Sequence, residues 1–247
     1  MAFTQDIIEP DVREAIAFST KTMLSDEPPM ETYFHLRQMI LLLTSLEWYW
    51  RDRNDFFAAG NLTIYYSRRQ KKNEEFRGPD FFVVLDTERK PRDSWVVWQE
   101  NYKFPNVIVE ILSESTAEID RSSKKQLYQD TFRTPDYFWF DPKTLEFRGF
   151  HLVGDEYQEL QANENGWLWS QELGLYLGIY QSQLRFFTSQ GQLVPISEET
   201  AEQEYQRAEQ ESQRAQQEYQ RAERESQLAK RLAQRLRDLG IDPSEEV

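Results

Sequence analysis

The sequence predicts a mixed α/β (α+β) domain, with a central mixed β-sheet flanked by helices, followed by a long charged C-terminal helix. Short runs of valine, isoleucine and aromatic residues alternate with turn residues and helically spaced segments over the first 196 residues. From about residue 197 to residue 239 there is no proline or glycine, and alanine, glutamate, glutamine and arginine predominate. These two compositions predict one globular domain and one helical extension.

The order of the elements predicts how the sheet is connected. The near-continuous valine and isoleucine run over 106–112 is typical of a buried central strand. A helical segment after it, followed by another strand, predicts a crossover connection. The expected elements are helices over 30–50 and 120–130, strands over 62–66, 81–85, 106–112 and 137–140, and a hairpin over 147–160 that turns at Gly154-Asp155.

The C-terminal segment repeats with a period of fourteen residues. The sequence of 201–214 is closely followed by that of 215–228. Small residues and tyrosines alternate at spacings of four and three, which is a heptad pattern. A single exposed helix and a homodimeric coiled coil through residues 201–239 both fit this pattern. We therefore divide the chain into an N-terminal lead-in segment (1–27), a globular domain (28–196), a helical or coiled-coil tail (197–240) and a disordered C-terminus (241–247).

Composition excludes several kinds of site. The chain has no cysteine and only two histidines, His35 and His151, which excludes thiolate zinc sites and histidine-rich metal centres. Metals with oxygen ligands, Mg²⁺ or Mn²⁺, remain. No segment resembles a signal peptide, and the longest apolar stretch, around 39–43, is too short to span a membrane. We therefore expect a cytoplasmic protein with no membrane contact.

The net charge of −14 disfavours tight non-specific binding to DNA, because that binding depends on basic residues at the phosphates. Any nucleic-acid contact must come from local basic patches, although each patch could also be a solvated loop. The candidates are Arg68, Arg69, Lys71 and Lys72 in one patch and Arg89, Lys90 and Arg92 in another.

Two carboxylates are placed where a metal ion could bind. Glu110 lies inside the apolar run over 106–112, on the same strand face as Ile108 and Leu112. A buried carboxylate needs a cation, although Glu110 could also lie at a solvated strand end beside a lysine. Asp80 follows Gly78-Pro79 at the entrance of the strand over 81–85, where an ordinary turn is the structural alternative. The thirty-residue separation would let neighbouring strands bring both carboxylates to one Mg²⁺.

A third group of candidates lies on the helix after the Glu110 strand. Asp120, Lys124 and Tyr128 follow one another at intervals of four, which places them on one helical face. Asp120 and Lys124 could be an ordinary helical ion pair. In a catalytic site, Lys124 would orient the attacking water and stabilise negative charge on the phosphate. Lys125 is adjacent but points away around the helix, so it ranks second.

Together these motifs resemble the Uma-type family of putative restriction endonucleases, in the PD-(D/E)XK nuclease-like superfamily. The resemblance covers roughly residues 28–195. It rests on Gly60-Asn61-Leu62 with Tyr65-Tyr66, on Gly78-Pro79-Asp80, on the stretch from Val109 to Thr116, on Asp120, Lys124 and Tyr128, and on Thr134-Pro135-Asp136-Tyr137 with Phe140-Asp141-Pro142.

The resemblance implies a restriction-endonuclease-like sheet in which Asp80 and Glu110 bind Mg²⁺ or Mn²⁺, with the Ile111 backbone carbonyl as a third ligand. It implies DNA as the substrate and Lys124 as the lysine supplied from the following helix. It also suggests that Glu31, on the first helix, supports the site.

Two positions depart from the expected pattern. Leu112 occupies the position, two residues after the glutamate, where most of the wider superfamily has its lysine. Glu114 stands where the family usually has proline.

The sequence therefore predicts a Mg²⁺-dependent endonuclease with Asp80, Glu110 and Lys124 as catalytic residues, supported by Glu31, Asp120, Tyr128 and Lys125. The alternative is a catalytically silent nuclease fold that serves as a binding or scaffold protein and oligomerises through its C-terminal helix. The acidic composition and the tail favour this alternative, whereas the intact acidic and basic set favours the enzyme.

Overall fold

The computed structural model describes residues 33–67, 76–113 and 120–238. The chain consists of two compact units, one ending at Ile196 and one beginning at Ser197. The expected lead-in over 1–27 and the expected disorder over 241–247 lie outside the described residues. None of the described helices is both long enough and apolar enough to cross a membrane.

A six-stranded sheet forms the centre of the first unit, in the order β1-β4-β6-β7-β8-β9. β6 and β7 are parallel, and the other neighbouring pairs are antiparallel, so the sheet is mixed, as predicted. All five residues of β6 are buried, which accounts for its valine and isoleucine run. The strands are β1 (Phe56–Gly60), β4 (Phe81–Leu85), β6 (Val107–Ile111), β7 (Asp136–Phe140), β8 (Phe147–Val153) and β9 (Glu156–Glu159).

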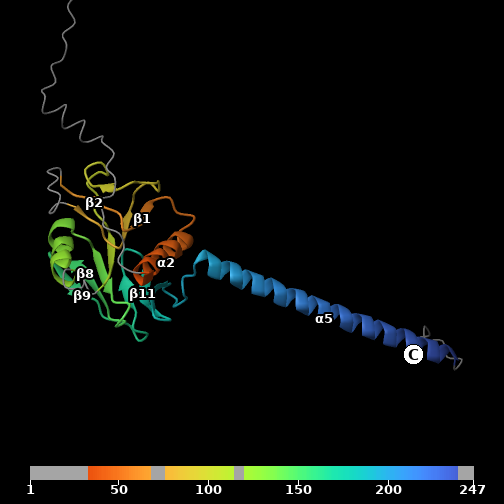
Figure 1. Cartoon of the computed structure of the whole chain (residues 1–247). Helices are drawn as coiled ribbons and strands as arrows, with labels where there is room; N and C mark the ends of the chain where they lie inside the picture. The colour runs from red at the N-terminus through yellow and green to blue at the C-terminus, as the bar shows by residue number, and fades with distance from the viewer. Residues whose placement is uncertain (1–32, 68–75, 114–119, 239–247) are drawn as a thin grey trace, which may run out of the picture. The chain divides into compact units, whose positions relative to one another are not determined.

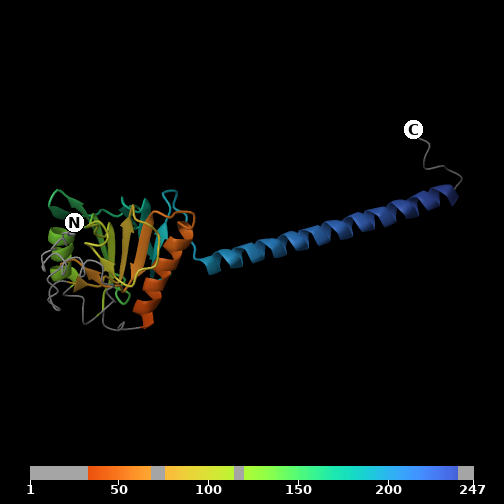
Figure 2. The same cartoon turned by 90° about the horizontal axis from the view of Figure 1, so that it is seen from above.

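Helices cover both faces of this sheet (Figures 1 and 2). On one face, α2 (Tyr33–Tyr49) contributes Leu42 to the core that contains Val109 of β6. On the other face, a helical segment between β6 and β7 contributes Tyr128 to the core that contains Ile108. Alternate side chains of β6 therefore belong to different cores, as the period of an extended strand requires.

The helical segment between β6 and β7 corresponds to the helix predicted over 120–130. It consists of η1 (Asp120–Lys124), α4 (Lys125–Leu127) and η2 (Tyr128–Phe132). Both η elements are π-helical turns, in which backbone hydrogen bonds reach one residue further than in an α-helix. Arg133 ends the segment in the left-handed conformation, with φ of 56°.

Two small three-stranded sheets complete the first unit, in the orders β10-β11-β12 and β3-β2-β5. Their strands are β2 (Ile64–Tyr65), β3 (Phe76–Arg77), β5 (Trp95–Val96), β10 (Leu168–Ser170), β11 (Leu175–Tyr180) and β12 (Gln183–Phe187). Of these, only β2 lies within a predicted strand. The Gln38 side chain joins α2 to β12, because its amide donates to the Leu184 carbonyl at 2.8 Å and accepts from the Leu184 amide at 2.9 Å.

The second unit is dominated by α5 (Ser197–Asp238), a helix of 42 residues in which no residue is buried. This confirms the predicted long C-terminal helix. Glu198 and Glu199 lie in its first turn and Arg235 and Arg237 in its last, so charges of the favourable sign lie at both ends of the helix dipole.

A buried carboxylate joins β7 to the second half of the domain. Asp136, at the start of β7, is fully buried, and both of its oxygens are engaged. Oδ1 lies 2.7 Å from His151 Nδ1 on β8, and Oδ2 accepts from Ser170 Oγ at 2.6 Å and from the Glu172 amide at 3.1 Å. This cluster links the central sheet to β10. Nearby, burial and the Asp136 charge raise the pKa of Tyr157 far above its usual range.

We expect Asp136→Ala to lower the free energy of unfolding by about 3 kcal/mol, because it leaves buried donors without their acceptor. Asp155→Ala is the matched control, since Asp155 is exposed and pairs with Arg133 at the surface, and its cost should stay below about 1 kcal/mol. Urea unfolding monitored by tryptophan fluorescence measures both. Equal, small losses would show that the Asp136 cluster contributes little to stability.

Candidate metal and catalytic site

Glu110 is the centre of the candidate site. It belongs to β6, its side chain is fully buried, and strand alternation places it with Ile108 rather than with Val109. Two side chains from the following helical segment engage it. Lys124 Nζ lies 3.1 Å from Oε2, and the Tyr128 hydroxyl donates to Oε1 at 2.7 Å. Each carboxylate oxygen thus receives a hydrogen bond that offsets part of its desolvation.

Lys124 and Tyr128 reach the same carboxylate, so they share a face of the segment, as the spacing predicted. Lys124 retains slight solvent access, with 18% of its side chain exposed, whereas Tyr128 is fully buried. A lysine that borders solvent beside a buried carboxylate can meet an incoming anion. The Asp120 side chain lies outside the described part of the structure.

Asp80 lies directly across from Glu110. The antiparallel register pairs Phe81 with Val109, and its continuation places Asp80 opposite Glu110. The Asp80 amide lies 3.5 Å from Glu110 Oε2, and Asp80 Oδ2 accepts from the Ile111 amide at 2.7 Å. The thirty-residue separation in sequence therefore becomes a close approach of two carboxylates at one end of neighbouring strands.

The structure adds His35, which the sequence analysis did not include among the site residues. His35 lies on α2, is buried, and its Nε2 is 2.8 Å from Asp80 Oδ1. The two residues are 45 positions apart, and no local motif joins them. The available signal was helical spacing. His35 precedes Met39, Leu42 and Leu46 at intervals of four, three and four, so it belongs to the face of α2 that is buried.

Three side chains and one backbone amide give every carboxylate oxygen of the site a polar partner. The two Asp80 oxygens meet His35 and the Ile111 amide, and the two Glu110 oxygens meet Lys124 and Tyr128. A carboxylate oxygen has two lone pairs, so a single hydrogen bond to it does not by itself exclude a cation. Within the described residues, no group of three or more histidine, aspartate or glutamate side chains is arranged to hold a metal ion. Glu31 lies outside those residues.

Lys125 is directed elsewhere. Its Nζ lies 3.5 Å from the centroid of the Phe150 ring on β8. Burial lowers the pKa of Lys125, and the nearby charge of Glu159 partly opposes that shift. Adjacent lysines on one helical segment thus have different environments: Lys124 meets a carboxylate and Lys125 an aromatic face.

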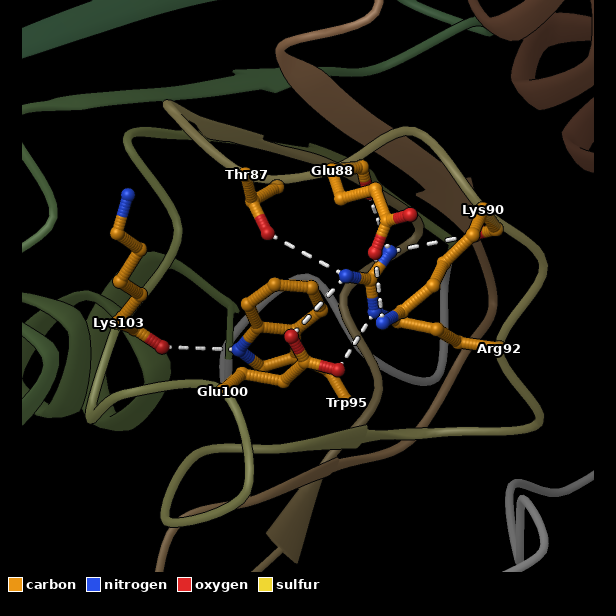
Figure 3. A network of polar contacts seen from close by, with 7 residues as sticks. All are labelled: Thr87, Glu88, Lys90, Arg92, Trp95, Glu100 and Lys103. Atoms are coloured by element: carbon orange, nitrogen blue, oxygen red, sulfur yellow. Dashed lines mark hydrogen bonds and ion pairs between the residues drawn. The ribbon is translucent and has the colours of Figure 1, made fainter.

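The second predicted basic patch, in the loop between β4 and β5, is internally paired (Figure 3). Arg92 binds Glu100 through two hydrogen bonds of 2.7 and 3.0 Å and lies against the Trp95 ring. Lys90 pairs with Glu88 at 2.9 Å, and Arg89 lies 3.8 Å from Glu47. These cations stabilise the loop and are paired with carboxylates of the loop, of α2 and of the turn after β5. The first patch, residues 68–72, lies outside the described residues.

Comparisons with known proteins place the chain in a family. A family model described as "Putative restriction endonuclease" (Uma2) matches residues 22–186. A search of curated proteins found no match. Among solved structures, the chain is similar to a putative nuclease belonging to DUF820 from Anabaena variabilis, with 11% identity and a TM-score of 0.41. That similarity covers 60% of this chain and 76% of the other.

The Tyr128 hydroxyl should be measurable in the stability of the domain. Tyr128→Phe removes one donor to a buried carboxylate and should lower the free energy of unfolding by about 2 kcal/mol. Tyr49→Phe removes a hydroxyl from an exposed tyrosine on α2 and should change it by less than about 0.5 kcal/mol. Both are measured by urea unfolding in the presence of a chelator. An unchanged midpoint for Tyr128→Phe would contradict the assigned hydrogen bond.

Proposed function

Because the chain belongs to the Uma2 family of putative restriction endonucleases, we propose that it is a metal-dependent endonuclease that hydrolyses phosphodiester bonds in DNA. The observation that carries this proposal is the pairing of Asp80 and Glu110 across β4 and β6, with Lys124 on the buried Glu110. Two carboxylates and a lysine lie together at one end of these neighbouring strands. They match the requirements of phosphodiester hydrolysis, which are ligands for a cation and a positive group for the phosphate.

The residues fit a small divalent cation with oxygen ligands. Asp80 and Glu110 would hold Mg²⁺ or Mn²⁺ through their carboxylates. The Ile111 amide points to Asp80, and in an extended strand the carbonyl of a residue points to the same side as its amide, so the Ile111 carbonyl is a reasonable third ligand. A bound divalent cation supplies positive charge at the attacked phosphate and lowers the pKa of water.

The protein side chains would bind the phosphate and hold the carboxylates in place. Lys124 would move from Glu110 toward the phosphate, orient the attacking water and stabilise the negative charge that develops on the phosphate oxygens. Tyr128 keeps Glu110 in place through its 2.7 Å hydrogen bond. The Ile111 amide and His35 hold Asp80 from the strand side and from α2. These partners restrict both carboxylates before any ligand arrives, which reduces the entropic cost of binding.

A second candidate is a catalytically silent nuclease fold that binds or scaffolds other molecules and self-associates through its tail. The internal pairing of Arg89, Lys90 and Arg92 favours it, because a loop neutralised by Glu47, Glu88 and Glu100 offers little attraction to phosphates. The net charge of −14 points the same way. The enzyme remains the better proposal because Glu110 is completely buried at a position where an apolar residue would cost less.

Metal binding can be tested without a nucleic acid. Asp80→Asn should weaken Mn²⁺ binding at least about tenfold, because a neutral amide replaces one of two anionic ligands. Asp86→Asn is the matched control, since Asp86 is an exposed aspartate just beyond the other end of β4 and should bind Mn²⁺ like the wild type. Titration followed by electron paramagnetic resonance counts free Mn²⁺. A wild-type protein that binds no Mn²⁺ would contradict the proposed metal site.

Cleavage of plasmid and linear DNA in Mg²⁺ and in Mn²⁺ tests the chemistry. Glu110→Gln and Lys124→Met should each lower the cleavage rate at least about a hundredfold, because they remove a metal ligand and the cation beside the phosphate. Lys143→Met changes an exposed lysine in the turn after β7 and should cleave normally. Circular dichroism verifies that all variants are folded. Wild-type protein that binds Mn²⁺ but never cuts DNA would favour the silent scaffold.

A further inference from the structure

The long helix α5 exposes a continuous heptad seam. No residue of α5 is buried, and the large apolar side chains of the seam are open to solvent, with 68% of Tyr205, 70% of Tyr219 and 37% of Leu236 exposed. Exposed aromatic and leucine side chains at regular heptad spacing are typical of a helix that pairs with another helix. The seam consists of Ala201, Tyr205, Ala208, Ser212, Ala215, Tyr219, Ala222, Ser226, Ala229, Ala233 and Leu236.

We propose that the partner of α5 is the α5 helix of a second copy of this chain, and that the two helices run antiparallel. This inference does not rest on nuclease activity. Antiparallel alignments that differ by one heptad all set seam positions against seam positions. The one with the greatest overlap of the two helices also sets each seam tyrosine against an alanine, and it places Ser212 of each copy level with Ala222 of the other. The same alignment sets Tyr219 against Ala215 and Tyr205 against Ala229.

Side-chain size favours this direction over a parallel pair. In the antiparallel alignment each seam tyrosine meets an alanine, so large and small residues alternate across the interface and the helices keep a nearly constant separation. In a parallel pair in register, Tyr205 would meet Tyr205 and Ala208 would meet Ala208. Those layers require different interhelical distances within one turn, because the distance depends on the side chains at the contact.

The distribution of apolar residues and charge points the same way. Between Glu198 and Glu225 the helix has nine glutamates and four arginines, whereas the last part, 227–238, has four basic residues and one aspartate. The leucines also lie only in that last part. Antiparallel pairing places the acidic end of one copy beside the basic end of the other. It also brings Tyr205 near the level of Leu232 of the second copy, which borders the seam.

The direction of pairing also sets the distance between the N-terminal ends of the two helices. In this alignment the Ser197 ends of the two helices lie about 60 Å apart, because forty residues separate their levels at 1.5 Å each. A parallel pair would bring the two ends together. The direction of pairing therefore decides whether the two α5 helices of one dimer begin side by side or at opposite ends.

The first test is the oligomeric state of the full chain. Sedimentation equilibrium should show a reversible dimer. Ala215→Glu places a charge in the seam and should raise the dissociation constant at least about tenfold, whereas Gln217→Glu adds the same charge on the outer face and should raise it less than about twofold. A monomeric wild-type chain, or equal effects of both variants, would overturn the proposal.

The second test determines whether the two helices run parallel or antiparallel. The chain has no cysteine, so introduced cysteines can be used without background disulfides. Chains carrying Ser212→Cys or Ala222→Cys are oxidised alone and as a mixture. Antiparallel pairing predicts a disulfide dimer in the mixture only, because Ser212 positions of the two copies would be about 15 Å apart, beyond the reach of a disulfide. Disulfide dimers of Ser212→Cys alone would establish parallel pairing, and an unlinked mixture would also overturn the antiparallel alignment.

Discussion

Burial of the Glu110 carboxylate is the constraint on which the candidate site depends. A fully buried carboxylate in a central strand is costly unless donors or a cation compensate it. The compensation comes from Lys124 and Tyr128, which lie on a helical segment that must therefore dock against this face of the sheet. The burial of Glu110 thus links three features of the fold: the order of the strands, the docking of the crossover helix and the position of Asp80 on the neighbouring strand. Removing the glutamate would release all of these requirements together.

Much of the site could be predicted because its residues lie in periodic elements. Glu110 stood out inside a valine and isoleucine run, and period-two alternation assigned its face. A period-four spacing predicted that Lys124 and Tyr128 share one side of the next helix, and both contact Glu110. The separation of Asp80 from Glu110 was compatible with neighbouring strands, and the observed register places them opposite one another. For Glu110, Lys124 and Tyr128, a local period carried the information.

The remainder depended on contacts without a local pattern. His35 reaches Asp80 from a helix 45 residues earlier, and its helix reads as ordinary apolar packing. The sheet of β10, β11 and β12 has strands of three to six residues whose pairing depends on tertiary contacts. The loop before β5 appeared to be a basic patch because sequence does not show that Arg92 folds onto Glu100 and Trp95.

Asp136 and Glu110, which are both fully buried, lie at opposite ends of the parallel pair β6 and β7 and belong to opposite faces of the sheet. A slip of β6 by one residue along β7 would turn Glu110 into the apolar layer beneath α2 and carry it away from its lysine. A slip of β7 would likewise remove Asp136 from Ser170. A misregistered pairing of β6 and β7 is therefore penalised at both ends of the pair. Parallel strands joined by a crossover form their contacts slowly, so during folding the correct register of this pair is selected by charge as well as by shape.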